Sequence, residues 1–178
     1  MIVVLIRHGH KGHMPFQDPE LMPQGFDQAI HLAELIASHD IPKPTHCWYS
    51  DKIRTRQTLS EAILKFNPVC TETKNLSTRA NNEPLADFRK KVQDFIATLS
   101  QRAQNKPDEV HFVCTHFDWI EESLTVIPSD QDLNSFQFAH WSPGQFILFE
   151  ITNELAAKTT TTTEKDFLWK FTTKGVLK

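Results

Sequence analysis

Residues 2–9 read Ile-Val-Val-Leu-Ile-Arg-His-Gly, a run of five apolar residues that passes directly into a polar turn. A short β-branched run without polar alternation is typical of a strand that is buried on both faces of a parallel sheet. In open α/β folds, ligands bind beyond the carboxyl ends of such strands. The stretch therefore predicts a central first strand with Arg7 and His8 at the ligand-binding edge of the sheet, where Gly9 permits a tight turn.

Helical and strand-like patterns alternate along the rest of the chain. Apolar residues recur at helical spacing from Gly25 to Ala37, again over 59–66, and most clearly on a helix that starts near Glu83-Pro84 and runs to Ala103. Short apolar runs predict strands at 47–49, 110–114, 145–151 and 166–171. We expect the last two to pair as a hairpin with a solvated, threonine-rich tip at 158–164. This order predicts a three-layer α/β/α sandwich with a central, mostly parallel sheet that is antiparallel at its C-terminal edge.

Length and composition limit the class of protein. A chain of 178 residues fits one domain, here residues 1–178, and 39% hydrophobic with 23% charged residues is the composition of a folded protein. The net charge is −3 without a dense Lys/Arg block, so we expect neither a nucleic-acid partner nor a membrane surface. The three cysteines, an odd number, indicate no disulfide framework, and the apolar run at 2–6 is too short for a signal peptide or a membrane span. We therefore expect a cytoplasmic protein, and the sequence carries no signal for an oligomeric state.

Polar residues suited to binding phosphate follow three of the predicted strands. Besides the Arg-His-Gly turn, the segment 50–58 leads from a strand into a helix and carries Arg54, and His116 follows the strand at 110–114. The carboxyl ends of parallel strands bring these segments to one edge of the sheet. A neutral imidazole can attack phosphorus while arginines stabilise the charge on the phosphoryl oxygens, and this reaction needs neither a metal nor a cofactor. A hydrogen bond to the other ring nitrogen of His8 must then keep the attacking nitrogen unprotonated.

At these motifs the sequence resembles the histidine phosphatase superfamily, also called the phosphoglycerate mutase-like family. The resemblance rests on an ordered set of segments from residue 2 to about residue 120. They are Leu-Ile-Arg-His-Gly at 5–9, Leu-Met-Pro-Gln-Gly-Phe-Asp-Gln-Ala at 21–29, Ser-x-x-x-Arg-Thr-x-Gln-Thr at 50–58, Glu-Pro-Leu-Ala-Asp-Phe at 83–88 and Thr-His at 115–116. The resemblance implies that His8 accepts the phosphoryl group and that Arg7, Arg54 and His116 form the phosphate pocket. It also implies a mostly parallel sheet covered by helices on both faces.

One element departs from the family pattern. Many members carry a proton-donating glutamate in a Leu-x-Glu segment after the third strand, where this chain has Leu-Ser-Thr at 76–78. Glu83, Asp118 and Glu121 are the candidates for the missing acid, and the remaining alternative is that no residue is dedicated to this role. A weak or absent acid favours substrates whose leaving group departs easily, such as phosphohistidine or an acyl phosphate. In this respect the chain resembles the small phosphohistidine phosphatases.

Taken together, these features predict a phosphatase. We expect it to hydrolyse a phosphomonoester or a phosphoramidate, without a metal, through a phosphohistidine intermediate. The candidate catalytic residues are Arg7, His8, Arg54, Glu83, Asp118 and His116, and His10 joins Arg7, Arg54 and His116 as a candidate for phosphate binding. The chain lacks obvious long insertions for a lid, which argues against a mutase. The expected substrate is a small phosphorylated molecule or a phosphohistidine protein.

Two other functions fit parts of the pattern. His8-x-His10-x-x-His13 approximates the zinc-binding loop of metallo-β-lactamase-like hydrolases. That loop needs an aspartate where Gly12 stands, and metal chemistry has no use for arginines at positions 7 and 54. The second alternative is a non-catalytic module that binds a phosphorylated ligand, supported only by the lost glutamate.

Residues around the expected pocket have simpler interpretations. Ser50 is expected to cap the following helix rather than to contact a ligand. Trp119, His140 and Trp141 are expected either to wall the substrate cleft or to pack in the core, since tryptophan serves both roles.

Overall fold

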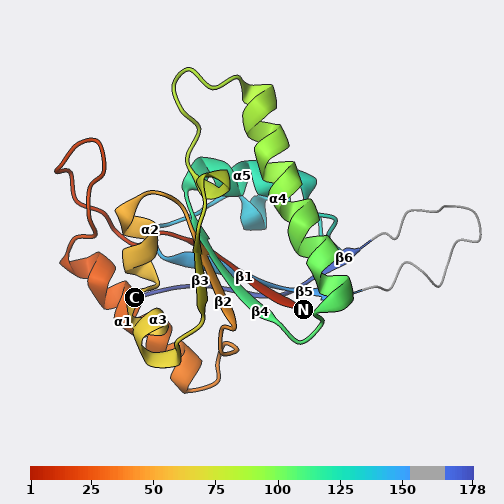
Figure 1. The fold of residues 1–178 in the computed structure, drawn as a ribbon, viewed down its shortest axis with the longest axis horizontal. Helices are drawn as coiled ribbons and strands as arrows, with labels where there is room; N and C mark the ends of the chain where they lie inside the picture. Colours follow the sequence, from red (N-terminus) through yellow and green to blue (C-terminus); the bar gives the residue numbers. More distant parts are fainter. Residues whose placement is uncertain (153–166) are drawn as a thin grey trace, which may run out of the picture.

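In the computed structural model, which describes residues 1–152 and 167–178, the strands form one six-stranded sheet with the order β3-β2-β4-β1-β5-β6 (Figure 1). In chain order the strands are β1 (Ile2–Arg7), β2 (His46–Tyr49), β3 (Val69–Glu72), β4 (Val110–Thr115), β5 (Gln145–Thr152) and β6 (Leu168–Val176). The pairs β1·β4, β2·β4 and β2·β3 are parallel, whereas β1·β5 and β5·β6 are antiparallel. The predicted sheet, with a central first strand and an antiparallel C-terminal edge, is therefore confirmed.

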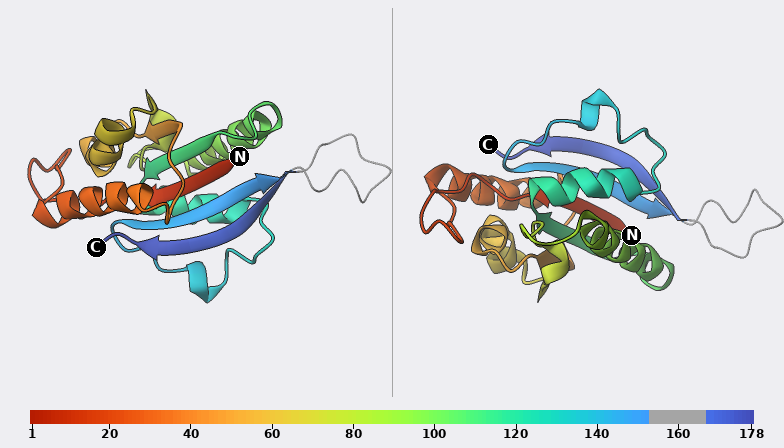
Figure 2. Two further views of the ribbon diagram at one scale, coloured as in Figure 1. Left: turned by 90° about the horizontal axis from the view of Figure 1, so that it is seen from below. Right: turned by 90° about the horizontal axis from the view of Figure 1, so that it is seen from above.

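Helices cover both faces of this sheet (Figure 2). On one face lie α1 (Pro23–Ala37), α2 (Ile53–Thr58) and α3 (Ser60–Phe66), and on the other lie α4 (Leu85–Asn105) and α5 (Phe117–Val126). Two short 3₁₀ helices, η1 (Lys74–Leu76) and η2 (Phe136–Phe138), lie in the connecting loops. The predicted three-layer sandwich is confirmed. Within the described part of the chain, no helix combines the length and the hydrophobicity needed to cross a membrane.

The continuous apolar run of β1 has a packing reason. Val3 and Leu5 point into the core on the α4/α5 face, whereas Val4 and Ile6 point into the core on the opposite face. The first core includes Phe88, Val92, Phe95, Trp119 and Ile120, and the second includes Leu32, Ile36, Leu59 and Ala62. Each of the four β1 side chains is at most 2% exposed, and full burial of one such side chain contributes about 1.5–3 kcal/mol. These contacts hold the strand that ends in the Arg-His-Gly turn.

The structure moves several predicted boundaries. The predicted helix over 59–66 proves to be the second of two, because α2 and α3 meet at Leu59, whose N–H donates to the Arg56 carbonyl (3.1 Å). The helix predicted from Glu83 begins at Leu85, with Pro84 as its N-cap. The hairpin of β5 and β6 is confirmed, although β6 extends to Val176. Its expected tip at 158–164 lies outside the described residues.

Two elements were absent from the sequence-based prediction. Strand β3 lies at the edge of the sheet, and Val69 is 60% exposed, so the strand lacks the apolar run that marks a buried one. Helix α5 does carry a signal, because the buried residues Trp119, Ile120 and Leu124 recur at helical spacing. This helix matters for the site, because it begins directly after His116.

Candidate active site

The segments that carry the phosphate-compatible residues meet at the carboxyl edge of the parallel strands. His8 follows β1 and His116 follows β4, and these neighbouring strands place Arg7 opposite Thr115. The His8 N–H donates to the Thr115 carbonyl (3.0 Å), and the two imidazole centroids lie 5.3 Å apart. Arg54, in the first turn of α2, donates from Nη2 to Nδ1 of His116 (3.2 Å). The structure thus brings three buried residues, His8, Arg54 and His116, into one cluster.

The hydrogen bonding of His8 leaves one ring nitrogen available for attack. Nδ1–H donates to the Gly9 carbonyl (2.8 Å), so Nε2 carries the lone pair. Burial lowers the pKa of His8 to about 3; the Gly9 carbonyl opposes this shift, and the charges of Arg54 and Arg7 add to it. The imidazole is therefore neutral at neutral pH, as an attacking nucleophile requires.

His116 has a partner on each ring nitrogen. Because a guanidinium only donates, Nδ1 of His116 accepts from Arg54, and Nε2–H donates to Ser50 Oγ (2.8 Å). Burial, followed by the charge of Arg54, lowers the pKa of His116 to about 2. The expectation that Ser50 caps a helix is wrong, because the N-cap of α2 is Lys52 and has no side-chain cap. The buried Ser50 hydroxyl instead positions His116.

The two arginines hold guanidinium nitrogens without partners. Nε of Arg7 and Nε of Arg54 are buried and bind no acceptor among the described residues. Arg54 Nη1 lies 3.4 Å from Asp18 Oδ1, and Arg7 donates from Nη1 to the Trp141 carbonyl with its guanidinium 5.3 Å from the centre of the Phe117 ring. An unpaired buried donor costs about 1–3 kcal/mol, and more when it is charged. Phosphoryl oxygens are acceptors that match guanidinium geometry, so the arrangement suits a phosphate-sized anion beside His8.

The Leu21–Ala29 segment contributes two residues that hold the histidine loop. Gln28, which is 2% exposed, accepts through Oε1 from the backbone N–H (2.9 Å) and from Nδ1 (3.1 Å) of His10. Its Nε2 donates to the carbonyls of Pro143 (3.0 Å) and Leu177 (2.9 Å). A Cβ on Gly25 would lie 2.2 Å from the His10 carbonyl oxygen, so only glycine allows α1 to approach this closely. Gln28 therefore joins the loop to the C-terminal strands, a role that the sequence reading did not assign.

Side chains of α2 tie the same loop to the arginine segment. The Gly9 N–H donates to Thr58 Oγ1 (2.9 Å), and that hydroxyl donates to the Arg54 carbonyl (2.8 Å). Gln57 Oε1 accepts from the Leu21 N–H (2.8 Å). The segments 5–9, 21–29 and 50–58 are thus joined by hydrogen bonds, which is a physical reason for their residue types. In the sequence, the only indication that Thr58, Gln57 and Gln28 matter for the site is that they belong to these motifs.

Comparison with solved structures finds the same architecture across most of the chain. The protein histidine phosphatase SixA, in complex with tungstate, aligns over 99% of this chain and 97% of its own with a TM-score of 0.71 and 15% identity. The SixA protein of Nakamurella multipartitia aligns over 83% of both chains (TM-score 0.61, 22% identity). The mycobacterial glucosyl-3-phosphoglycerate phosphatase, in complex with VO3, aligns over 96% of both (TM-score 0.68, 13% identity). The chain has the fold of the histidine phosphatase superfamily. No protein-family model and no curated protein matches it.

On this histidine phosphatase fold, the candidate acids lie in different settings. Both carboxylate oxygens of Glu83 accept from Lys91 Nζ (3.0 and 3.2 Å), and Oε2 also accepts from the Ala80 N–H (3.1 Å). Burial raises the pKa of Glu83, but these hydrogen bonds outweigh it and hold the pKa below its usual value. Burial, together with the charge of Asp118, raises the pKa of Glu121. Glu83 is therefore a carboxylate, whereas the setting of Glu121 favours the protonated form.

Asp118 is occupied as a hydrogen-bond acceptor. Its Oδ2 accepts from the Thr78 hydroxyl (2.6 Å) and from the Arg79 N–H (2.7 Å). Thr78 stands where the family pattern has its glutamate, so in this chain Asp118 holds that segment from the first turn of α5. This arrangement makes Asp118 a support for the loop at 77–81.

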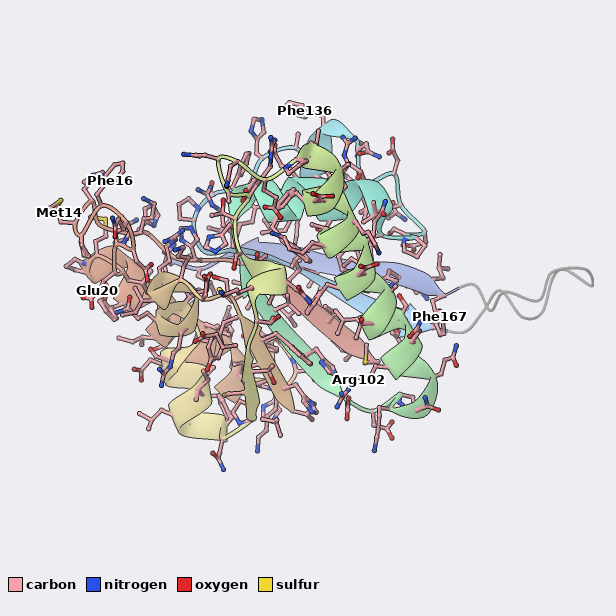
Figure 3. All side chains as sticks on the ribbon, turned by 45° about the horizontal axis from the view of Figure 1, so that its top comes forward. Met14, Phe16, Glu20, Arg102, Phe136 and Phe167 are labelled. Carbon is pink, nitrogen blue, oxygen red and sulfur yellow. The ribbon has the colours of Figure 1, made fainter. Side chains whose placement is uncertain are left out.

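Of four further residues considered near the pocket, two tryptophans lie in the core and two histidines lie on the surface. Trp119 and Trp141 are buried in the core, and Trp119 donates from Nε1 to the Asn75 carbonyl (2.7 Å). His140 is exposed and contacts Phe136, whose exposed ring is labelled in Figure 3. His13 is also exposed. In the described residues, the nitrogens of His8, His10 and His13 do not converge into a set of three metal ligands, so the zinc-loop alternative has no geometric support.

Two histidines and a glutamate at the opposite end of the sheet have the spacing of a metal site. His46, Glu109 and His111 bring one ligand atom each to within 4.8 Å of one another. However, Trp48 Nε1–H donates to Nδ1 of His111 (2.8 Å), which leaves the proton on Nε2, where it faces Glu109 (2.9 Å). A metal on Nε2 would move that proton to Nδ1, against the indole N–H. Arg102, labelled in Figure 3, already binds both oxygens of Glu109, so the cluster is a structural ion-pair network.

Proposed function

We propose that the protein is a phosphatase that works without a metal through a phosphohistidine intermediate. The observation that carries this proposal is His8, buried and neutral, with Nδ1 bonded to Gly9 and Nε2 unshared, near two arginines whose Nε groups lack acceptors among the described residues. Attack by Nε2 forms the N–P bond while the bond from phosphorus to the leaving group breaks. Water then displaces His8 from phosphorus, which releases inorganic phosphate and regenerates the neutral imidazole.

The neighbours of the same fold support the reaction class. Two of them are phosphatases whose solved structures contain tungstate or VO3, both of which are oxyanions, like phosphate. The arginine and histidine cluster described above would hold such an anion through charge-assisted hydrogen bonds.

The settings of the candidate acids bear on the substrate class. Glu83 is held as a carboxylate by Lys91, and Asp118 accepts two hydrogen bonds. Glu83 and Asp118 are thus not free to donate a proton to the leaving group in the transition state. This favours a phosphoramidate such as phosphohistidine, or an acyl phosphate, over an alkyl monoester. The substrate would be a phosphohistidine protein or a small molecule with such a bond.

The proposal is tested by a screen of phosphorylated compounds under exhaustive chelation. We expect phosphate release from an aryl phosphate, an acyl phosphate and a phosphohistidine peptide, at rates unchanged by EDTA. Activity that disappears on chelation and returns with zinc would restore the metal-hydrolase alternative. A protein that binds vanadate but releases no phosphate from any compound would be the non-catalytic module.

The absence of a dedicated acid predicts a particular response to leaving groups. We expect kcat/KM to fall by orders of magnitude from aryl to alkyl phosphates, and Glu83→Gln to change both by less than about threefold, because a carboxylate held by Lys91 has no proton to give. Glu121→Gln and Asp118→Asn serve as comparisons in the same assay. A variant that slows alkyl phosphates at least about tenfold more than aryl phosphates would identify its residue as the acid.

A further inference from the structure

A groove of about 660 Å³ lies beside the segments that follow β2 and β3. Its walls include Gln17, Lys52, Lys74, Thr78, Arg79 and Lys91. Among the described residues, every residue that lines it is polar or charged except Ala80. Such a surface suits a polar ligand rather than an aliphatic or aromatic one.

Three segments that line this groove lie next to residues that contact or adjoin the phosphate cluster, formed by His8, Arg54 and His116. Gln17 adjoins Asp18, which pairs with Arg54 (3.4 Å). The Lys52 N–H donates to Ser50 Oγ (3.1 Å), the atom that holds His116. The loop with Thr78 and Arg79 is fastened to Asp118, two residues past His116. The groove is therefore lined by segments that adjoin the residues holding Arg54 and His116.

The described lining of the groove holds four cations and two carboxylates, Asp51 and Glu83, which leaves two positive charges unbalanced. Both oxygens of Glu83 are taken by Lys91, and Asp51 accepts from the Ser77 hydroxyl (2.6 Å). Lys52, Lys74 and Arg79 form no ion pair within the described residues. Arg79 donates from Nε to the backbone carbonyl of Glu83 (2.9 Å), so its terminal nitrogens remain for another acceptor.

A second cavity, of about 580 Å³, lies across the loop that carries Arg79. Its walls hold the carboxylates of Asp118, Glu121 and Glu122, and Arg79 is the one basic residue that lines it within residues 1–152 and 167–178. The loop thus separates a space rich in cations from a space rich in carboxylates. An anionic leaving group would be attracted to the first and repelled from the second.

We propose that the groove binds a second anionic group, a carboxylate or a further phosphate, carried by the leaving group of the substrate. The inference rests on the proposed phosphatase function and narrows its substrate class. Lys74 and Arg79 bind the second anionic group and Lys52 adds to the positive potential, while Arg7 and Arg54 hold the phosphoryl group that is transferred. Substrates with an uncharged leaving group are used less well, because they leave the three cations without a counterion.

The test compares two aryl phosphates with matched leaving-group pKa values, one of which carries a ring carboxylate. We expect the carboxylate to raise kcat/KM by about five- to tenfold, mainly through KM, which is the effect of a few exposed ion pairs. The double variant Lys74→Gln/Arg79→Gln should abolish this preference. Lys90→Gln is the matched control, because Lys90 is an exposed cation of α4 that pairs with Asp94 outside the groove. Equal use of the two compounds by the wild type, or a preference that survives in the folded double variant, would overturn the proposal.

A binding measurement separates this proposal from the proposed function. Calorimetry with the same two compounds on His8→Ala measures the charge preference without turnover. A preference in Kd that the double substitution removes supports the groove even if the wild type hydrolyses neither compound. The absence of a preference in both Kd and kcat/KM rejects the groove, whether or not the protein is a phosphatase.

Discussion

His8→Ala is expected to reduce the hydrolysis of an aryl phosphate by at least about a thousandfold, since removal of a nucleophile that forms a covalent intermediate eliminates the main reaction path. The structure assigns this role to one atom, Nε2, because Nδ1 is bonded to the Gly9 carbonyl. With its pKa lowered to about 3, His8 does not need to lose a proton before it attacks at neutral pH. The measurement is the initial rate of phosphate release by the wild type and the variant, with folding checked by circular dichroism.

The same prediction has a chemical signature. Wild-type enzyme that is quenched in alkali while turning over a radiolabelled phosphate ester should retain a phosphoryl label that is stable in base and labile in acid, as a phosphohistidine is. His13→Ala is the matched control, because His13 lies on the same loop but is exposed, and it should keep both rate and label. A label that survives in His8→Ala, or a variant as fast as the wild type, contradicts the covalent mechanism.

The central part of the fold could be predicted because burial leaves a strong pattern. The uninterrupted run of β1 identified a strand covered on both faces, and the stripe of α4 identified a long helix. Strand β3 could not be found in this way, because its residues at the sheet edge are mostly exposed. Boundaries moved for a similar reason: the end of β6 contains exposed polar residues that pair through the backbone with β5.

For the candidate site, the sequence indicated the charged residues but not the groups that position them. His8, Arg54 and His116 follow predicted strands, and the structure places them together. The roles of Ser50 and Gln28 depend on contacts over 66 residues and up to 149 residues of sequence separation, which no local pattern reveals. The same applies to Glu83, whose ionisation depends on its hydrogen bonds to Lys91.

Arg54→Ala is expected to lower kcat/KM for an aryl phosphate by about 10²- to 10³-fold, because one preorganised donor to a developing charge is worth about 3–4 kcal/mol. Arg54 has two functions in the structure: Nε is a buried donor without an acceptor among the described residues, and Nη2 holds Nδ1 of His116. Arg54→Lys should recover little of this loss, because an ammonium group keeps the charge but cannot reach two acceptors with a planar fork. The value of kcat/KM should fall and the Kd for vanadate should rise in the same variant, since the same nitrogens bind the ground-state anion and the transition state.

Arg56→Ala is the matched control for this substitution. Arg56 lies on the same turn of α2, but it is exposed and forms no ion pair in the described part of the chain. Its removal should change kcat/KM by less than about twofold, because an exposed cation contributes little through solvent. If Arg54→Ala and Arg56→Ala have equal and small effects, the buried guanidinium does not bind the phosphoryl group, and the phosphate site must be sought elsewhere. A large effect confined to Arg54 would instead tie catalysis to the one α2 cation that contacts His116.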